Sequence, residues 1–165
     1  MTKPDISAPA GKQEVSVTSI FDTHRERVWK RWTEPKQFPC WWGLKDFTSP
    51  FAKIDLRGGG GYPSNMRGPD GKEYGDTGTY EEIIEPQRIV YTDSFADEYG
   101  NLVPATYYEM RSDQPVEMAI EVTLDDIVGK TRLTLEQCGI LEGEMIEQAR
   151  AGWDQSFDKL AECLR

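Results

Sequence analysis

The C-terminal segment 142–164 constrains the fold more than any other part of the chain. Six apolar side chains recur there at steps of three or four residues: Met145, Ala149, Trp153, Phe157, Leu160 and Leu164. Residues at these spacings lie on one face of an α-helix. At about 1.5 Å per residue the helix would be roughly 35 Å long, enough to lie across a small sheet. The pattern therefore predicts one long helix, Glu142 to Leu164, whose apolar face needs a partner surface.

The middle of the sequence is typical of short β-strands separated by turns. The predicted strands are 51–57, 61–67, 78–84, 88–95, 117–124 and 131–137. The residues at 68–71 (Gly-Pro-Asp-Gly) and at 126–130 have the chemistry of hairpin turns. Consecutive strands joined by hairpins form an antiparallel sheet, and its apolar face must be covered. The long C-terminal helix is the element suited to cover it.

The N-terminal part predicts a tail, a strand and two short helices. Residues 1–12 are aperiodic and carry Pro, Ala and Gly, so we expect a disordered tail followed by one domain over 13–165. Residues 14–22 alternate as a strand does. Thr23 and Glu26 have the spacing of a capping box at the start of a helix over 24–34. Residues 36–43 are rich in aromatic side chains and predict a second, shorter helical turn.

Four successive glycines, Gly58 to Gly61, allow two interpretations. A phosphate-binding loop needs a Lys-Ser or Lys-Thr pair at the start of a helix. Here the glycines precede Tyr62, Pro63 and Ser64 and then a predicted strand and hairpin. The helix N-terminus that would bind the anion is therefore missing. We expect these glycines to bend a sheet instead.

Charge and cysteine content exclude several classes of function. The net charge is −10 with one histidine, which disfavours binding to nucleic acids or anionic membranes. Cys40, Cys138 and Cys163 form no close pair, and the sequence has no long apolar run. We therefore expect three reduced thiols in a cytoplasmic protein. No metal-ligand spacing surrounds His24, so neither a metal nor another cofactor is expected.

The stretch 55–92, DLRGGGGYPSNMRGPDGKEYGDTGTYEEIIEPQRIVYT, resembles the middle of the activator of heat-shock-protein ATPase homologue family. Further matches are FDTHRERVWKRWTEP at 21–35, WWG at 41–43 and GWDQSFDKLAECL at 152–164. The family belongs to the START-like (SRPBCC) helix-grip superfamily. The resemblance implies an α+β fold in which a curved antiparallel sheet of six or seven strands wraps around the long C-terminal helix. It also implies a cavity between the sheet and the helix.

Apolar and aromatic side chains on the inner faces should line that cavity. The candidate ligand-binding residues are Trp41, Trp42, Tyr62, Met66, Tyr80, Tyr91, Phe95, Met118, Met145, Ala149 and Trp153. The alternative is that all of them belong to the hydrophobic core. The set contains tyrosines and methionines rather than leucines. Tyrosine brings a hydroxyl that needs a partner, and methionine tolerates varied shapes, which favours a pocket.

Two titratable residues, Asp93 and His24, are the candidates for a catalytic role. Asp93 shares its strand parity with Tyr91 and Phe95, which would turn its carboxyl inward. Because an unpaired buried carboxylate is costly, we expect a bulge to turn Asp93 outward. His24 is expected at the first position of its helix, and a single histidine supports no Ser-His-Asp set. We therefore predict no catalytic residue.

The sequence leaves three functions open. The first is a ligand-binding module, monomeric or homodimeric, that holds a small hydrophobic or aromatic molecule in the cavity. The second is a chaperone (heat-shock-protein ATPase) cofactor, as the family resemblance implies. The third is a cyclase- or hydratase-like enzyme that uses the same pocket, which a buried carboxyl group with a shifted pKa would indicate. The long connection 97–115, with its three tyrosines, is predicted to form a flap or an extra strand at the cavity mouth.

Overall fold

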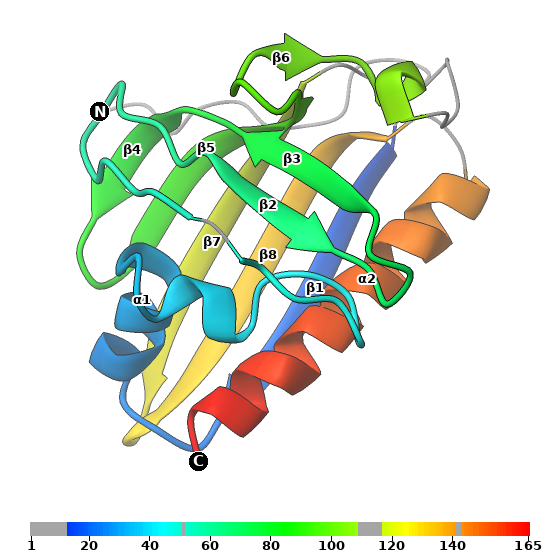
Figure 1. Cartoon of the computed structure of the whole chain (residues 1–165). Coiled ribbons are helices and arrows are strands. Elements are labelled where there is room, and N and C mark those ends of the chain that lie inside the picture. The colour runs from blue at the N-terminus through cyan, green and yellow to red at the C-terminus, as the bar shows by residue number, and fades with distance from the viewer. Residues whose placement is uncertain (1–12, 51, 109–116, 141–142) are drawn as a thin grey trace.

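A computed structural model describes residues 13–50, 52–108, 117–140 and 143–165 (Figure 1). The strands are β1 (Gln13–Phe21), β2 (Ser64–Arg67), β3 (Glu73–Thr77), β4 (Tyr80–Ile84), β5 (Arg88–Ala96), β6 (Leu102–Val103), β7 (Met118–Ile127) and β8 (Lys130–Ile140). The helices are α1 (Arg25–Thr33) and α2 (Gly143–Cys163), with 3₁₀ turns η1 (Phe38–Cys40) and η2 (Ala105–Tyr108). The predicted tail, residues 1–12, lies outside the described residues.

The strands form one antiparallel sheet in the order β1-β8-β7-β5-β3-β2, with β4 and β6 also paired to β5. The first strand lies beside the last, because Val17 pairs with Leu135. The sheet curls so that the β2–β3 hairpin stands in front of β8 and β1, while α2 runs along the opening on the right (Figure 1). This is the predicted helix-grip arrangement, with eight strands rather than six or seven.

The inner face of α2 packs against the sheet as the apolar periodicity predicted. Trp153, Phe157, Leu160 and Leu164 are buried in the hydrophobic core. Ala149 is half-buried in the same row, and the side chain of Met145 lies outside the described residues. The fold therefore buries most of one helix face, as a helix on a curved sheet must.

Glycines permit the close approaches on which the curvature depends. A Cβ atom at Gly78 would lie 1.9 Å from the carbonyl oxygen of Thr92, so β4 can reach β5 only without a side chain there. The run Gly58–Gly61 forms a turn that docks on β4, where the amide of Gly59 donates to the carbonyl of Tyr80 at 2.8 Å. Strand β2 follows this turn, so the structure agrees with a bend rather than a phosphate loop.

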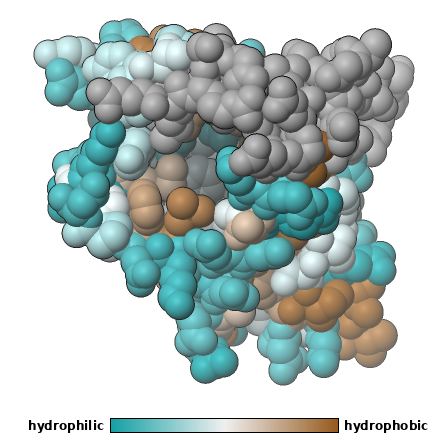
Figure 2. All heavy atoms as spheres, turned by 90° about the vertical axis from the view of Figure 1, so that its right-hand side faces the viewer, coloured by the Kyte–Doolittle hydropathy of each residue, from teal (hydrophilic) through white to brown (hydrophobic). Residues whose placement is uncertain are grey.

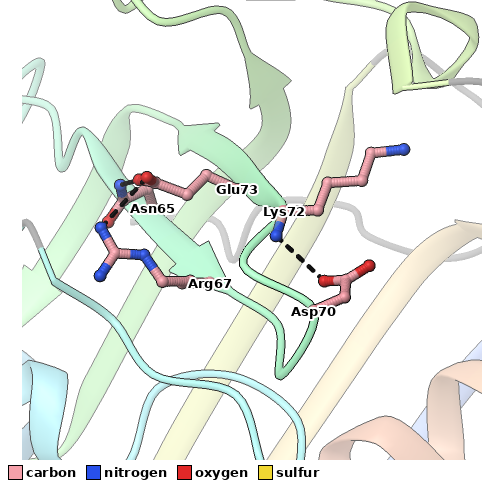
Figure 3. Close-up of polar contacts among 5 residues, drawn as sticks. All are labelled: Asn65, Arg67, Asp70, Lys72 and Glu73. Atoms are coloured by element: carbon pink, nitrogen blue, oxygen red, sulfur yellow. Dashed lines mark hydrogen bonds and ion pairs between the residues drawn. The ribbon is translucent and has the colours of Figure 1, made fainter.

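The β2–β3 hairpin forms around the predicted Gly-Pro-Asp-Gly turn (Figure 3). Arg67 and Glu73 make an exposed ion pair at 3.1 Å across the two strands. The side chain of Asn65 donates to Glu73 at 2.6 Å. In the turn itself the backbone amide of Lys72 donates to Asp70 Oδ1 at 3.0 Å, which closes an Asx-type turn.

Two local predictions were wrong. Segment 51–57 makes no described strand, because its described residues form only an isolated bridge between Ala52 and Ser64. The Thr23 capping box does not form either, and α1 begins after His24 without a side-chain cap. The hydroxyl of Thr23 instead accepts from Arg27 Nη1 at 3.1 Å. Its carbonyl accepts from the hydroxyl of Thr131 at 2.7 Å, so contacts with β8 replace the local cap.

The prediction of three reduced thiols was wrong for two of them. Cys40 and Cys163 are joined in a disulfide, with Cα atoms 6.4 Å apart. They are 123 residues apart in sequence, and the fold brings η1 beside the C-terminal end of α2. Cys138 is buried on β8, and its thiol lies 3.9 Å from the carbonyl oxygen of Ala119. None of the described helices is both long enough and apolar enough to span a bilayer.

Candidate functional site

A small void lies inside the aromatic core between the sheet and the helices. Its volume is about 10 Å³, and it is lined by Trp32, Phe38, Trp42, Tyr62, Tyr80, Ile89 and Tyr91. That space suffices for about one water molecule. Four of the predicted site residues, Trp42, Tyr62, Tyr80 and Tyr91, meet here.

Neighbouring elements hold these rings in place. Tyr80 on β4 and Tyr91 on β5 are register partners. Tyr62 precedes β2, and its ring stands at 90° to that of Tyr91 with centroids 5.3 Å apart. Trp42 follows η1 and stacks on Phe38, with centroids 4.8 Å apart. Edge-to-face and stacked pairs of this kind are the arrangements that aromatic rings prefer.

The loop that carries Trp42 is fastened to α2. The ammonium group of Lys159 donates to three backbone carbonyls, at 3.2 Å to Trp42, 3.2 Å to Leu44 and 2.9 Å to Phe47. The hydroxyl of Ser156 donates to the carbonyl of Gly43 at 2.8 Å. A Cβ atom at Gly152 would come within 3.1 Å of the Leu44 side chain, so helix and loop are in close contact. Helix α2 therefore determines where the indole of Trp42 lies.

Two carboxyl groups adjoin the aromatic void. Asp76 on β3 is only 5% exposed, and the indole N–H of Trp42 donates to its Oδ2 at 3.3 Å. Asp93 on β5 is partly buried. The hydroxyl of Tyr62 lies 3.0 Å from Asp93 Oδ1 and 2.7 Å from the carbonyl oxygen of Thr92. Two rings of the void, Trp42 and Tyr62, thus carry the hydrogen-bond donors for the two carboxyls.

The expectation that Asp93 turns outward was wrong. Strand β5 pairs with β7 without a register shift from Arg88 to Asp93, so no bulge rotates the carboxyl away. The bulge lies in β4 instead, between Tyr80 and Glu82. Strand alternation therefore holds, and Asp93 faces the same side as Tyr91.

Burial changes the protonation chemistry of both carboxyls. Burial raises the pKa of Asp93 to about 6, although hydrogen bonds from Tyr62 and from the backbone of Ser94 act in the opposite direction. Burial, and then the negative charge of Asp93, raise the pKa of Asp76 well above its usual range. No described ion pair involves either residue. The pair can accept hydrogen bonds, bind a cation or exchange a proton near neutral pH.

Two buried hydroxyls beside this pair have no hydrogen-bond partner within the described part of the chain. They belong to Tyr91, which is 3% exposed, and to Ser64, the register partner of Asp76. Burial also raises the pKa of Tyr91, so its hydroxyl stays protonated at neutral pH. A buried hydroxyl without a partner costs free energy, so such groups mark places where a water or a ligand atom fits.

Inner-face residues further from the void are only half-buried, in contrast to the core. They are Met66, Phe95, Met118 and Ala149. Figure 2, which faces α2, shows a hollow in the surface where hydrophobic atoms lie between hydrophilic rims. The indole N–H of Trp153 donates to Gln137 Oε1 at 2.9 Å, and Gln137 Nε2 lies 3.1 Å from the sulfur of Met118. We name this half-buried set, with the Asp76–Asp93 pair, the inner recess.

Comparison with known proteins agrees with this geometry. Residues 22–165 match the family model described as "Activator of Hsp90 ATPase homolog 1-like protein". The chain belongs to this family. No curated protein matches the chain.

Solved structures share the fold. A protein from Arthrobacter aurescens is 24% identical with a TM-score of 0.76, covering 98% of this chain and 89% of that one. A protein from Mycobacterium smegmatis is also 24% identical, with a TM-score of 0.75 over 98% and 96% of the two chains. The AHSA1 protein from Silicibacter pomeroyi is 21% identical, with a TM-score of 0.74 over 92% and 96%. At these identities the likeness shows the fold alone.

Trp41 and Trp153 were also predicted as ligand-binding residues, but neither lines the void. Trp41 is fully buried in the core. Its indole N–H points to the first helix, where it donates to the carbonyl of Arg31 at 2.8 Å. The ring of Trp153 packs against that of Trp42, with centroids 6.0 Å apart. Sequence reasoning missed Asp76, although its parity with Ser64 across the hairpin would place it on the inner face. It also missed Trp32, Phe38, Ile89 and Gln137, which the apolar pattern alone does not distinguish from core.

The connection after β5 supplies an extra strand. Residues 102–103 form β6, which pairs with β5, and the hydroxyl of Tyr108 accepts from the amide of Gly75 at 2.9 Å. Tyr107 and Tyr108 line an open cleft of about 760 Å³ that also reaches Asp76 and Lys53. Residues 109–116 of this connection lie outside the described residues, so its role as a flap stays a prediction. Within the described residues no three His, Cys, Asp or Glu side chains gather as a metal site.

Proposed function

We propose that this protein binds a small hydrophobic or aromatic molecule in the inner recess, between the sheet and α2. The observation that carries the proposal is the buried Tyr91 hydroxyl, which has no partner among the described residues and belongs to a ring that lines the void. Ligand pockets combine apolar walls with a few polar groups that fix orientation, and this combination is present here.

The energetics favour a binding role over a purely structural one. An unsatisfied buried hydroxyl costs about 1–3 kcal/mol, whereas a phenylalanine would fill the same space at no such cost. A second unpartnered hydroxyl, that of Ser64, and the carboxyl pair lie in the same region. Stability alone would select against this concentration of polar groups, and a ligand that meets them would compensate for it.

Family membership supports a ligand-binding or chaperone-cofactor role in general terms. The polar groups of Tyr91 and Ser64 are buried, where a small molecule can reach them but a protein surface cannot. This favours the ligand over the chaperone.

The raised pKa of Asp93, about 6, supports a second candidate, proton-transfer chemistry on a bound substrate of the cyclase or hydratase type. A carboxyl that titrates near neutral pH can both give and take a proton. If the protein is such an enzyme, a bound compound recovered after incubation will differ in mass or in chromatographic retention, because hydration adds a water whereas ring closure can leave the mass unchanged. Recovery of unchanged compounds from wild-type protein would reject this candidate.

The binding proposal is tested by fluorescence titration with naphthalene and 2-naphthol. Trp42 and Trp153 adjoin the recess, so their emission should respond to both compounds. Tyr91→Phe should weaken 2-naphthol binding about three- to tenfold and leave naphthalene unchanged, because only the naphthol can pair with the hydroxyl. The matched control is Tyr99→Phe, the same chemical change at a side chain that is 81% exposed. A protein that responds to neither compound contradicts the proposal.

A further inference from the structure

The Asp76–Asp93 pair has hydrogen-bond donors but no described cation. Trp42 and Tyr62 provide one neutral donor each. A buried carboxylate is normally compensated by Lys, Arg or a metal ion. Lys53 borders the same open cleft as Asp76 but makes no described ion pair with it. When these carboxyl groups ionise, no described cation balances them, so that negative charge is left for a ligand to balance.

The surrounding rings also suit a positive charge. The rings of Tyr62, Tyr91 and Trp42 line the void, and the planes of Tyr62 and Tyr91 stand at 90° to each other. Aromatic faces attract organic cations, and each such contact contributes about 0.5–2 kcal/mol depending on exposure. The unpartnered hydroxyls of Tyr91 and Ser64 are independent of the carboxyls, and each can accept a hydrogen bond from an ammonium N–H.

We infer that the ligand of this site is an organic cation: an amine or ammonium group carried on a hydrophobic or aromatic body. The nitrogen lies at Asp76 and Asp93. The body of the ligand packs against the half-buried wall of the inner recess, Met66, Phe95, Met118 and Ala149. This inference rests on the proposed function and narrows it to one class of ligand.

The electrostatics of the whole chain act in the same direction. The net charge of −10 raises the local concentration of cations and speeds their encounter. Binding should also be linked to pH, because the cation favours the ionised form of both carboxyls. Asp93 is half-protonated near pH 6, so cation binding there should release a proton.

Among the described residues, the other titratable groups around the pair include the tyrosines of the void and, in the cleft that Asp76 borders, Lys53, Glu73, Asp97 and Tyr108. Tyr62, Tyr80 and Tyr91 have pKa values raised by burial and stay neutral. From α2, the ammonium of Lys159 is engaged with the backbone carbonyls of the Trp42 loop. The affinity for a cation should therefore rise with pH between about 5 and 7 through the carboxyl pair.

The decisive experiment compares 2-naphthylmethylammonium with its uncharged counterpart 2-naphthylmethanol, which has the same ring and nearly the same size. Calorimetric titration of the wild-type protein at pH 8 should give at least about tenfold tighter binding of the ammonium compound, as a buried charge-assisted contact supplies. The preference should shrink at pH 5. At pH 6 the binding enthalpy should differ between phosphate and Bis-Tris buffers, because the released proton is taken up by the buffer.

Two variants locate the effect. Asp93→Asn should abolish the preference for the ammonium compound while leaving 2-naphthylmethanol affinity unchanged. Asp158→Asn, an exposed position on α2 with the same change of net charge, should retain the preference.

The outcomes separate the inference from the proposed function. If both compounds bind equally, or the alcohol binds more tightly, the cation inference is overturned and the binding function stands. If Asp93→Asn keeps the full preference, the carboxyl pair is not the recognition site and the inference also fails. If neither compound binds, the proposed function and the inference fail together.

Discussion

Two pairs of carboxyl groups adjoin strand β5 on its opposite faces, and they are compensated in opposite ways. At its start Arg88 donates to Glu82 on β4 and to Glu121 on β7. These three side chains are 15%, 10% and 4% exposed respectively. Near its end Asp93 lies with Asp76, and the described donors to this pair are neutral. One pair encloses an arginine, whereas the other encloses no described cation.

The difference separates structural charge from charge that is available to a ligand. Burial acts to lower the pKa of Arg88, but the hydrogen bonds and charges of Glu121 and Glu82 raise it, so the guanidinium keeps its positive charge between the two carboxyl groups. The Asp76–Asp93 pair relieves its repulsion by holding protons instead. Carboxyl groups that already enclose a cation stabilise the sheet, whereas a pair without one can bind a cation from a ligand.

The largest effect on stability is expected when the cluster of Arg88, Glu82 and Glu121 loses its cation. Arg88→Met removes the guanidinium that pairs with both Glu82 and Glu121, and we expect a loss of about 3–5 kcal/mol in the free energy of unfolding. Urea denaturation at pH 7 measures it. The matched control is Arg132→Met, which breaks the exposed pair with Asp125 and should cost about 0–1 kcal/mol. Equal small losses in both variants would show that the cluster is not buried as described.

A smaller change in stability, with the opposite sign, is expected at the Asp76–Asp93 pair. The folded-state pKa of Asp93 is about 6, against an ordinary value of 3.8. Its contribution to stability is therefore fully present below about pH 4 and is lost as the pH rises through 6. Relative to wild type, Asp93→Asn should gain about 2–3 kcal/mol between pH 4 and pH 7, since a two-unit shift corresponds to about 2.7 kcal/mol. Urea denaturation at unit pH steps checks this, and a pH-independent difference contradicts it.

The smallest effect distinguishes the two tyrosines of the pocket. Tyr62→Phe removes the donor to Asp93 and should cost about 1–2 kcal/mol, with a further rise in the pKa of Asp93. Tyr91→Phe removes a hydroxyl without a described partner and should be neutral or stabilising by up to about 1 kcal/mol. Thermal unfolding of the two variants in parallel makes the comparison. The reverse order of stabilities would place the carboxyl beside Tyr91 instead.

The fold was predictable from sequence where the signal is local. The apolar steps from Ala149 to Leu164 identified α2, because helix periodicity depends only on the segment itself. The hairpin turn at 68–71 was predicted in the same way and joins β2 to β3, although no strand was predicted at 73–77. The Cys40–Cys163 bond and the lost Thr23 cap were not predictable, because both depend on elements more than a hundred residues apart.

The candidate site was predictable in its walls but not in its chemistry. Alternation assigned Tyr80 and Tyr91 to the inner face, and the structure makes them register partners in β4 and β5. The direction of the Asp93 side chain was predicted wrongly. Strand alternation points it inward, but the cost of burying a carboxylate favoured a bulge that would turn it outward. The structure keeps the parity and reduces the cost with the Tyr62 hydroxyl and a raised pKa. Such compensation comes from a separate segment, so a single strand pattern cannot reveal it.

The pairing of β1 with β8 has a consequence for how the chain reaches this structure. Val17 finds its partner Leu135 only after nearly all of the sequence has been synthesised. During translation the apolar side chains of β1 have no neighbouring strand to pack against. They become buried only when the later hairpin of β7 and β8 has formed. Contacts that distant in sequence slow folding and prolong the exposure of apolar surface. The nascent chain is therefore most vulnerable to aggregation before β8 emerges from the ribosome.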